Sequence, residues 1–384
     1  MRVLVVGATG LIGSAVAARL VEEGHEVVGV ARRLGAAAPR LPALRWVALD
    51  IGRLTKPDDW IAHLGGLNAV VNCAGALQSG PADDVKAVHA DGVAALFAAC
   101  ERLGIRRVVQ VSAIGVDRAQ PTEFSRTKLA GDEALMARDL DWVILRPSVV
   151  LGRAACGGSA LIRGLAALPV LPVLPGGAPL QVVQLDDVTR TVLFFLAPDA
   201  PSRVSVELAG PERLAFDEVV KAYRRWLGYR DPRLVHVADG LAGLLYRLGD
   251  LAGRLGWRPP VRSTARAELA RGAAGDPAEW TRLTGIVPRS LSGALAAEPA
   301  SVQERWFAGL YLLKPVIFVI LALFWIVTGL LSIRPGYPMG VQLMLESGAG
   351  RLSGPSVIAG GLADLLIGIG IAFRRTTRIA LWAA

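Results

Sequence analysis

An uncharged apolar run near the end of the chain constrains the fold more than any other feature. Residues 315–333 read PVIFVILALFWIVTGLLSI and carry no charged side chain. With a rise of about 1.5 Å per residue, a helix of this length crosses a hydrocarbon core of about 30 Å. We therefore expect a transmembrane helix here, in a chain that is divided between lipid and water.

A second apolar run follows at 356–373 and reads SVIAGGLADLLIGIGIAF. Its small residues favour close helix packing; they are Ala359, Gly360, Gly361 and Gly368. The run also contains one carboxylate, Asp364. An ionisable side chain is costly inside a bilayer, so Asp364 is either a functional residue or the partner in a packing hydrogen bond. Both interpretations stay open.

Basic residues flank the outer ends of the two runs: Arg305, Lys314, Arg374, Arg375 and Arg378. Basic flanks favour the cytoplasmic side of a membrane. We predict a multi-pass protein of the inner (cytoplasmic) membrane, with residues 334–355 on the far side and the N-terminal part of the chain in the cytoplasm. Arg334 and Arg351 in the connecting segment weaken this contrast.

The beginning of the chain carries a glycine-rich turn between a predicted strand and a predicted helix. Residues 2–6 are a short β-branched run, GATGLIG follows, and SAVAARLVEEG has the apolar spacing of a helix. Gly7 permits a sharp turn, Gly10 lets backbone approach a pyrophosphate, and Gly13 lets helix pack on strand. Further alternating units follow. We predict an α/β fold: a Rossmann-type, doubly wound parallel sheet followed by an α-helical transmembrane domain.

The composition narrows the range of partners. The chain has 384 residues, of which 53% are hydrophobic and 20% charged, with a net charge of +9. Lys and Arg are scattered and form no nucleic-acid motif, so we expect a lipid bilayer and a phosphorylated ligand as partners, and no nucleic acid. Cys73, Cys100 and Cys156 lack metal-ligand spacing, and we expect reduced, buried thiols and no metal site.

The end of the second predicted strand bears on the choice of nucleotide. NAD-preferring sites carry an acidic residue there, about twenty residues after the glycines, for the ribose 2′-hydroxyl. This chain has Ala31, Arg32 and Arg33 instead. Guanidinium groups pair with a 2′-phosphate, which favours NADP(H) over NAD(H). The alternative is a solvated basic loop.

GATGLIG resembles the extended and atypical short-chain dehydrogenase/reductases (SDRs), and later motifs agree in order: ALD, NCAG, RRVVQVSAIGV, TKLAGDEAL and LRPSVVLG. The resemblance covers about residues 1–235. Within the superfamily the chain is similar to the NAD(P)-binding family of the nucleotide-binding accessory subunit of respiratory complex I. The resemblance implies cofactor contacts at Gly7, Thr9, Gly10, Leu11, Ile12, Gly13, Arg32, Arg33, Asp50, Ile51, Cys73, Ala74, Gly75, Ser112, Lys128 and Pro147.

One segment departs from the SDR pattern. Enzymes of that superfamily carry Tyr-x-x-x-Lys on a helix, with the Tyr as proton donor. Phe124 occupies the tyrosine position and Lys128 is retained. A phenyl ring has no proton to give, and all five tyrosines of the chain lie at position 223 or later. The resemblance leaves Ser112 and Lys128 as the candidate catalytic residues, with a cofactor contact as the alternative role for Ser112. We expect His25, His63 and His89 to be structural residues on helix or loop surfaces.

Residues 236–304 are expected to form a helical extension and linker. Within them, 237–257 (VADGLAGLLYRLGDLAGRLGW) have amphipathic helical spacing. Such a helix covers the Rossmann core, which we prefer, or lies in a membrane interface. The tail at 305–384, including QERWFAGLYLLKP, resembles the DoxX-like membrane domain. That domain usually has four helices, so we expect this tail to be incomplete and further helices to follow residue 384.

Two functions from different classes follow. The first is a membrane-anchored, SDR-like NAD(P)(H)-dependent oxidoreductase that acts on a quinone or a lipophilic carbonyl. The second is a non-catalytic nucleotide-binding module that stabilises or senses a membrane protein complex. Phe124 favours the second, and the intact cofactor motifs favour neither. A nucleotide-sugar epimerase is a poorer interpretation, because it too needs the tyrosine.

Overall fold

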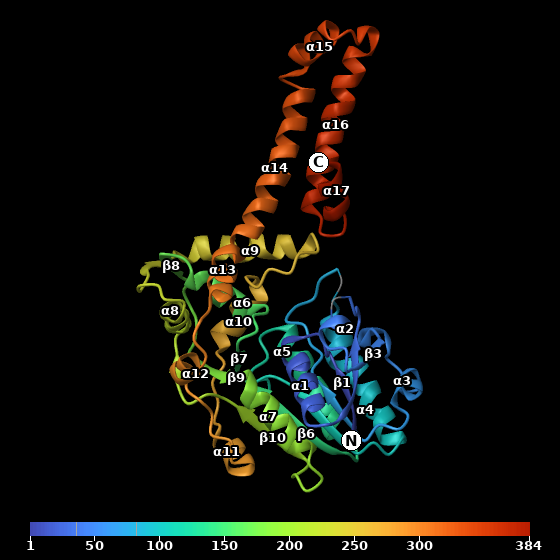
Figure 1. Cartoon of the computed structure of the whole chain (residues 1–384), viewed down its shortest axis with the longest axis vertical. Helices are drawn as coiled ribbons and strands as arrows, with labels where there is room; N and C mark the ends of the chain where they lie inside the picture. Colours follow the sequence, from blue (N-terminus) through green and yellow to red (C-terminus); the bar gives the residue numbers. More distant parts are fainter. Residues whose placement is uncertain (36, 82) are drawn as a thin grey trace.

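The computed structural model describes residues 1–35, 37–81 and 83–384. Its N-terminal part is built on a seven-stranded parallel sheet in the order β10-β6-β5-β4-β1-β2-β3 (Figure 1). The strands are β1 Arg2–Val6, β2 Glu26–Ala31, β3 Arg45–Ala48, β4 Ala69–Asn72, β5 Arg107–Val111, β6 Asp141–Pro147 and β10 Val204–Leu208. The strand order reverses between β1 and β4, and in open sheets ligands bind at such a switch point. The predicted Rossmann class is confirmed.

Helices cover both faces of this sheet. They are α1 Leu11–Glu22 and α7 Leu185–Leu196 on one face, and α3 Pro57–Leu64, α4 Gly92–Arg102 and α5 Glu123–Met136 on the other. Successive strand residues point to opposite faces. Val3 and Val5 of β1 therefore join the core under α1 and α7, while Leu4 and Val6 join the core under α3, α4 and α5.

A smaller unit adjoins the carboxyl edge of the sheet and has its own apolar core. Its strands are β7 Val149–Leu151, β8 Val170–Val173, β9 Leu180–Gln184, β11 Arg213–Leu214 and β12 Arg233–His236. Its helices are α6 Gly158–Ala166, α8 Phe216–Trp226, α10 Ser263–Arg271, α12 Leu291–Ala297 and α13 Val302–Tyr311. The helix α11 Ala278–Thr284 instead packs beside β10 of the large sheet, where Trp280 joins the core under α1 and α7. A short helix, α2 Ala37–Arg40, lies between β2 and β3.

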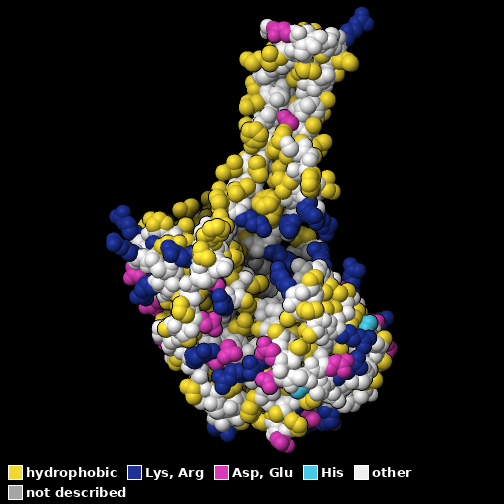
Figure 2. Space-filling model, in the orientation of Figure 1, with side chains coloured by type: hydrophobic (Ala, Val, Ile, Leu, Met, Phe, Trp, Pro, Cys, Tyr) yellow, Lys and Arg dark blue, Asp and Glu magenta, His cyan; other side chains and the backbone are white. Residues whose placement is uncertain are grey.

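A helical hairpin projects from this body (Figure 1). The predicted run 315–333 lies in α14 Leu313–Ile333, and the predicted run 356–373 corresponds to α16 Ser353–Ala372. Both helices are long and apolar enough to cross a membrane, and apolar side chains cover their outer surface (Figure 2). The connecting α15 Tyr337–Glu346 caps the far end, and α17 Thr377–Ala383 folds back beside the near end.

Glycines allow α14 and α16 to pack closely. A methyl group at Gly368 would lie 2.9 Å from the carbonyl oxygen of Ala322, and one at Gly361 would lie 2.6 Å from Cγ1 of Ile333. Gly360, in contrast, faces open space. Two of the four predicted small residues thus lie at the helix contact.

The amphipathic segment forms α9 Asp239–Arg254, and its leucines are exposed rather than packed on the sheet. The preferred interpretation, a helix that covers the Rossmann core, is therefore wrong. The apolar stripe of this helix indicates only that one side is hydrophobic; it does not indicate whether protein or lipid covers that side. The expectation of three buried thiols is also only partly right, because Cys100 is buried, Cys73 is half-buried and Cys156 is exposed.

Candidate cofactor and active site

The glycine-rich turn brings β1 against the end of β4. Gly7 has a φ of +78°, and the N–H groups of Gly7 and Ala8 donate to the carbonyl oxygen of Val30 at 2.9 and 3.1 Å. A methyl group at Gly7 would lie 2.8 Å from the backbone nitrogen of Ala74. Both the left-handed backbone and the close approach require glycine here.

The start of α1 is open to an anion. A methyl group at Gly13 would lie 2.3 Å from the carbonyl oxygen of Gly7, so the helix begins directly against the turn. Gly10 provides no side-chain cap, and the first turn, which starts at Leu11, has no acidic residue. Free N–H groups and the helix dipole favour a phosphate at this position. Thr9 lies in the glycine-rich turn before α1, and Leu11 and Ile12 are the first two residues of the helix.

Asp50 and Ile51 follow β3 at the same edge of the sheet. The Asp50 carboxylate accepts a hydrogen bond from the N–H of Gly52 at 3.3 Å and so begins a short 3-10 turn. Ile51 is buried under α4. The backbone of Gly92 lies so close to the carbonyl oxygen of Ile51 that a methyl group at Gly92 would be 2.2 Å from it. This rigid turn would form the adenine end of the site.

Arg32 follows β2 and is held by an ion pair. Its Nη2 lies 2.5 Å from Asp83, in the loop after β4, and Nη2 of Arg258 lies 2.6 Å from the other oxygen of the same carboxylate. Arg33, the next residue, is exposed. Two guanidinium groups share one carboxylate, so the cluster retains a net positive charge at the end of β2.

The segment after β4 forms a trough. Buried Asn72 donates to Gln110 at 2.7 Å, and its Oδ1 accepts from the N–H of Ala74 at 3.1 Å, which fixes the turn through Cys73 to Gly75. Burial raises the pKa of the Cys73 thiol to about 12. The group is therefore a thiol at neutral pH and not a nucleophilic thiolate.

Lys128 lies beneath this trough, on α5. Its Nζ donates to the carbonyl oxygens of Val111 at 2.9 Å and Ala74 at 3.4 Å. The side chain is buried, and burial lowers its pKa to about 8, although Asp132 opposes the shift. Pro147 ends β6, the strand next to β5. Its carbonyl oxygen accepts a hydrogen bond from the N–H of Ile114 at 3.1 Å.

His89 is buried, so the expectation of a surface histidine is wrong. Its Nε2 accepts a hydrogen bond from the N–H of Ala76 at 3.0 Å, and this assigns the ring proton to Nδ1, 3.1 Å from Oγ1 of Thr127. Burial, reinforced by Lys128, lowers the pKa of His89 to about 2. The neutral ring makes a T-shaped contact with the ring of Phe124, with 5.6 Å between the centroids. His89 thus supports the trough.

Ser112 belongs to a buried polar network. Its hydroxyl donates to Asp132 at 2.8 Å, and Nε of Arg146 lies 3.3 Å from the same carboxylate oxygen. Arg146 also pairs with Asp117 at 2.5 Å. Burial raises the pKa of Asp132, opposed by Ser112 and Arg146. This network was missed from sequence, although Asp132 lies one helical turn after Lys128, on the same side of the helix.

Phe124 lies one turn before Lys128 and is half-buried. In the part of the chain that the structure describes, no tyrosine takes its place at the trough. Tyr223 is buried in the core of the smaller unit, Tyr246 lies on the buried side of α9, and Tyr311 packs on Gly164. The described residues also contain no group of three His, Cys, Asp or Glu side chains that could hold a metal ion.

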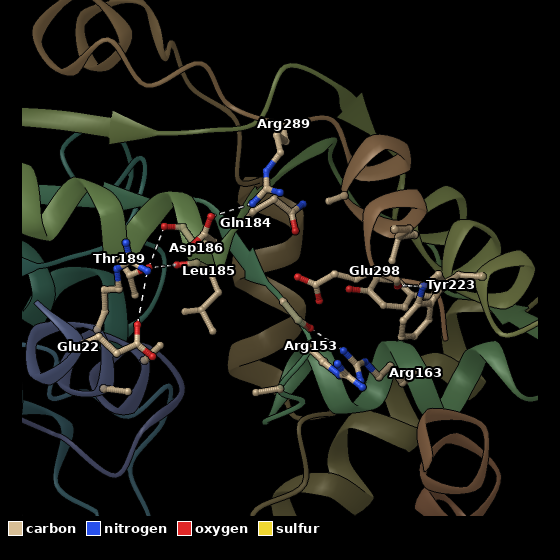
Figure 3. A pocket seen from close by; sticks show the side chains of 18 residues that line it. Glu22, Arg153, Arg163, Gln184, Leu185, Asp186, Thr189, Tyr223, Arg289 and Glu298 are labelled. Carbon is tan, nitrogen blue, oxygen red and sulfur yellow. Dashed lines mark hydrogen bonds and ion pairs between the residues drawn. The ribbon is translucent and has the colours of Figure 1, made fainter. Parts of the chain in front are cut away.

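A separate cavity of about 300 Å³ lies between α1, α7 and the smaller unit (Figure 3). Arg289 pairs with Asp186 at 3.0 Å on one side. On the other side the guanidinium of Arg163 lies over the rings of Tyr223 and Trp226. None of the predicted cofactor residues lines this cavity, so it is distinct from the trough.

Comparisons with known proteins agree with this geometry. A family model described as NAD(P)H-binding matches residues 7–162, and a DoxX-like family model matches residues 322–384. The chain therefore joins an NAD(P)H-binding Rossmann domain to a DoxX-like domain. The DoxX-like match and the two apolar helices indicate a membrane protein.

Curated relatives match about 60% of the chain. An uncharacterized protein of Mycobacterium tuberculosis is 30% identical over 59% of this chain and 23% of its own length, so the chain spans about a quarter of that relative. A ceramide reductase of Caulobacter vibrioides is 23% identical over 62% of this chain and 74% of its own. The photosystem II assembly factor Ycf39 of Synechocystis is 23% identical over 59% of this chain and 68% of its own.

Solved structures share the fold. The Bordetella bronchiseptica enzyme WbmG in complex with NAD superposes with a TM-score of 0.61 at 15% identity, over 81% of this chain and 95% of its own. UDP-glucuronic acid 4-epimerase from Bacillus cereus, with NAD, gives 0.59 at 17% identity, over 82% and 100%. These likenesses establish an SDR-type fold.

Proposed function

We propose that this chain is a membrane-anchored NADP(H)-binding protein that reduces a quinone, or a similar lipophilic carbonyl, at the membrane surface. The observation that carries the proposal is the contact between the loop after β4 and the base of the hairpin. Nη2 of Arg375, just after α16, lies 3.5 Å from the carbonyl oxygen of Pro81, and Arg258 pairs with Asp83. The trough is therefore next to the membrane end of the molecule.

The residues of the glycine-rich turn and of the trough fit a dinucleotide. A side chain at Gly7 or Gly13 would collide with backbone atoms, so glycine keeps the turn tight against α1 and the end of β4, and α1 begins without a capping side chain. When bound, NADPH supplies a hydride, so that quinone, NADPH and one proton give quinol and NADP⁺. Lys128, Cys73 and Gly75 would line the nicotinamide end, and Asp50 the adenine end.

Phe124 favours a quinone over an ordinary ketone. Reduction of a ketone forms an alkoxide, which needs a proton donor at the moment of hydride transfer. A reduced quinone is a phenol, with a pKa of about 10, and needs much less assistance. The relative named ceramide reductase supports a lipophilic substrate but does not distinguish these two classes.

The test compares two electron acceptors in one preparation. The full chain, reconstituted in phospholipid vesicles, is given NADPH with a lipid-soluble benzoquinone or with a long-chain ketone, and NADPH oxidation is followed. We expect turnover with the quinone and very little with the ketone. Tight NADPH binding without turnover of either acceptor would overturn the enzymatic proposal.

The second candidate is a non-catalytic module that stabilises or senses a membrane complex. The observations that favour it are the missing hydroxyl at Phe124 and the engagement of Ser112 with Asp132 at 2.8 Å. Relatives named photosystem II assembly factor support it as well. Affinity purification from membranes with and without added NADPH tests it, because a sensor would retain a partner in a nucleotide-dependent way.

We also infer the orientation. Arg374 and Arg375 lie at the end of α16 that faces the NAD(P)H-binding domain. Basic residues favour the cytoplasmic side, which supports an inner-membrane protein whose domain at 1–235 is cytoplasmic. Within the linker at 236–304, the helix α9 would then lie at the membrane surface, whereas α11 lies on the body away from the hairpin (Figure 1). The spans would belong to 305–384.

A further inference from the structure

We propose that α9 lies in the plane of the membrane interface, with its leucine stripe inserted among the lipids of an anionic bilayer. The stripe consists of Leu241, Leu244, Leu245, Leu248 and Leu251, which are 41–54% exposed. At about 100° per residue these five positions share one side of the helix. The proposal goes beyond the function proposed above but rests on α14 and α16 crossing the bilayer.

The opposite side of α9 is already occupied by protein. Ala242 and Tyr246 are buried, and a methyl group at Gly249 would lie 1.7 Å from the carbonyl oxygen of Val261. Arg262 reaches back to Asp250 at 3.1 Å. The helix is thus fixed on the body by one side, and the leucine side is exposed.

The C-terminal end of α9 is joined to the base of the hairpin. The carbonyl oxygen of Leu255 accepts a hydrogen bond from the N–H of Arg374 at 3.0 Å. Nε1 of Trp257 donates to the carbonyl oxygen of Ala372 at 2.7 Å, and its ring packs on Phe318 at 5.0 Å between centroids. The C-terminal end of α9 therefore lies beside the end of the hairpin that joins the body.

Figure 1 shows α9 lying crosswise to α14 and α16 at this level. A helix crosswise to membrane spans at their base is parallel to the membrane surface. In Figure 2, apolar side chains beside the base of the hairpin continue from its apolar surface, with dark blue side chains at their borders. Exposed Leu234 and Val235 of β12, immediately before α9, extend this apolar area.

The charges fit a lipid surface better than a protein partner. Arg247 and Arg254 are exposed and flank the leucine stripe, and Arg374 lies over the ring of Trp257 at 5.4 Å. Interfacial helices combine an apolar face with flanking basic residues and a tryptophan in this way. Insertion of the leucines among lipid tails would remove their exposed apolar surface from water, and this favours the interfacial position of a helix that is already tethered to the spans.

Spin labels on adjacent residues test the proposal. The variants Leu248→Cys and Arg247→Cys are made in the full chain with Cys156→Ser, because Cys156 is the exposed native thiol. A third variant, Leu323→Cys, labels the outer surface of α14, where Leu323 is 55% exposed. Each labelled protein is reconstituted in vesicles of phosphatidylethanolamine and phosphatidylglycerol. Collision with oxygen, which concentrates in lipid, is compared with collision with a water-soluble nickel chelate.

We expect labels at 248 and 323 to collide with oxygen several-fold more than with the nickel chelate, and the label at 247 to show the reverse. A water-exposed label at 248 together with a lipid-exposed label at 323 would overturn the interfacial helix and leave the spans intact. A label at 248 shielded from both reagents would mean that a second copy or another protein covers the stripe, which also overturns the proposal. Water exposure at 323 would contradict the spans themselves.

Discussion

At the scale of single residues, the trough retains Lys128 and its supports, but Phe124 stands where the SDR pattern has a tyrosine hydroxyl. Lys128 is held by two carbonyl oxygens, His89 is fixed as a neutral ring, and Phe124 lies against that ring. Cofactor positioning and proton donation therefore depend on different side chains. Variants can separate them.

The variant Phe124→Tyr should gain activity on a small ketone. It places a hydroxyl one helical turn from Lys128, and acid assistance of this kind is typically worth about 10²–10⁴-fold in rate. NADPH oxidation with a test ketone measures the gain, and Phe124→Leu is the matched control without a hydroxyl. Efficient ketone reduction by the wild-type protein would show that another group supplies the proton.

Arg32 should set a preference for NADPH. We expect the wild-type protein to bind NADPH at least tenfold more tightly than NADH, about 1.4 kcal/mol, and Arg32→Glu to reduce or reverse this ratio. Calorimetry provides both affinities. Arg258→Glu is the control, because it also removes an ion pair to Asp83 but lies on a different segment. Equal effects of the two variants would assign the preference to the Asp83 cluster rather than to Arg32.

His89 should make the fold sensitive to acid. Its pKa is about 2 in the folded chain and 6.5 in the unfolded chain, so below pH 6.5 only the unfolded chain gains this proton. The free energy of unfolding then falls by about 1.4 kcal/mol per pH unit, or about 2 kcal/mol by pH 5. Thermal unfolding of the detergent-solubilised chain at pH 7.5 and pH 5 measures this loss of stability. His89→Gln should lose less stability between these values than the wild type, and an identical loss would contradict the assignment.

At the scale of elements, the local signals predicted the structure well. GATGLIG forms the turn before α1, and the two apolar runs form α14 and α16. What could not be predicted depends on neighbours that are distant in sequence. His89 is buried because α5 packs over it, and Ser112 turns to Asp132 because Arg146 of β6 holds that carboxylate. The exposed side of α9 likewise depends on where the hairpin emerges.

The helix contact within the hairpin should depend on Gly368. A larger side chain there would collide with Ala322 and Ile326, and overpacking of this kind typically costs about 1–3 kcal/mol. We expect Gly368→Leu to lower the melting temperature in detergent, as measured by fluorescence-detected size exclusion. Gly360→Leu, on the same helix but facing open space, should have little effect. Similar losses in both variants would show that helix propensity rather than contact is responsible.

At the scale of the whole molecule, the basic end of the hairpin lies against the NAD(P)H-binding domain, and α15 lies at the far end (Figure 1). Expressed in bacteria, the chain should remain in membranes after carbonate extraction. A reporter inserted after Gly348 should report the periplasm, and one fused before β1 should report the cytoplasm. Solubility without detergent, or a cytoplasmic signal from both reporters, would contradict the orientation.

The contacts of Arg375 with Pro81 and of Trp257 with Ala372 join the body to the base of the hairpin, and in the orientation that we propose they would hold the trough close to the lipid surface. A substrate dissolved in the bilayer would then reach it by diffusion in two dimensions. Its encounter rate would follow its mole fraction in the membrane and not its amount per volume of water. Addition of inert phospholipid at constant total substrate should therefore slow the reaction, as surface dilution slows enzymes that work at an interface.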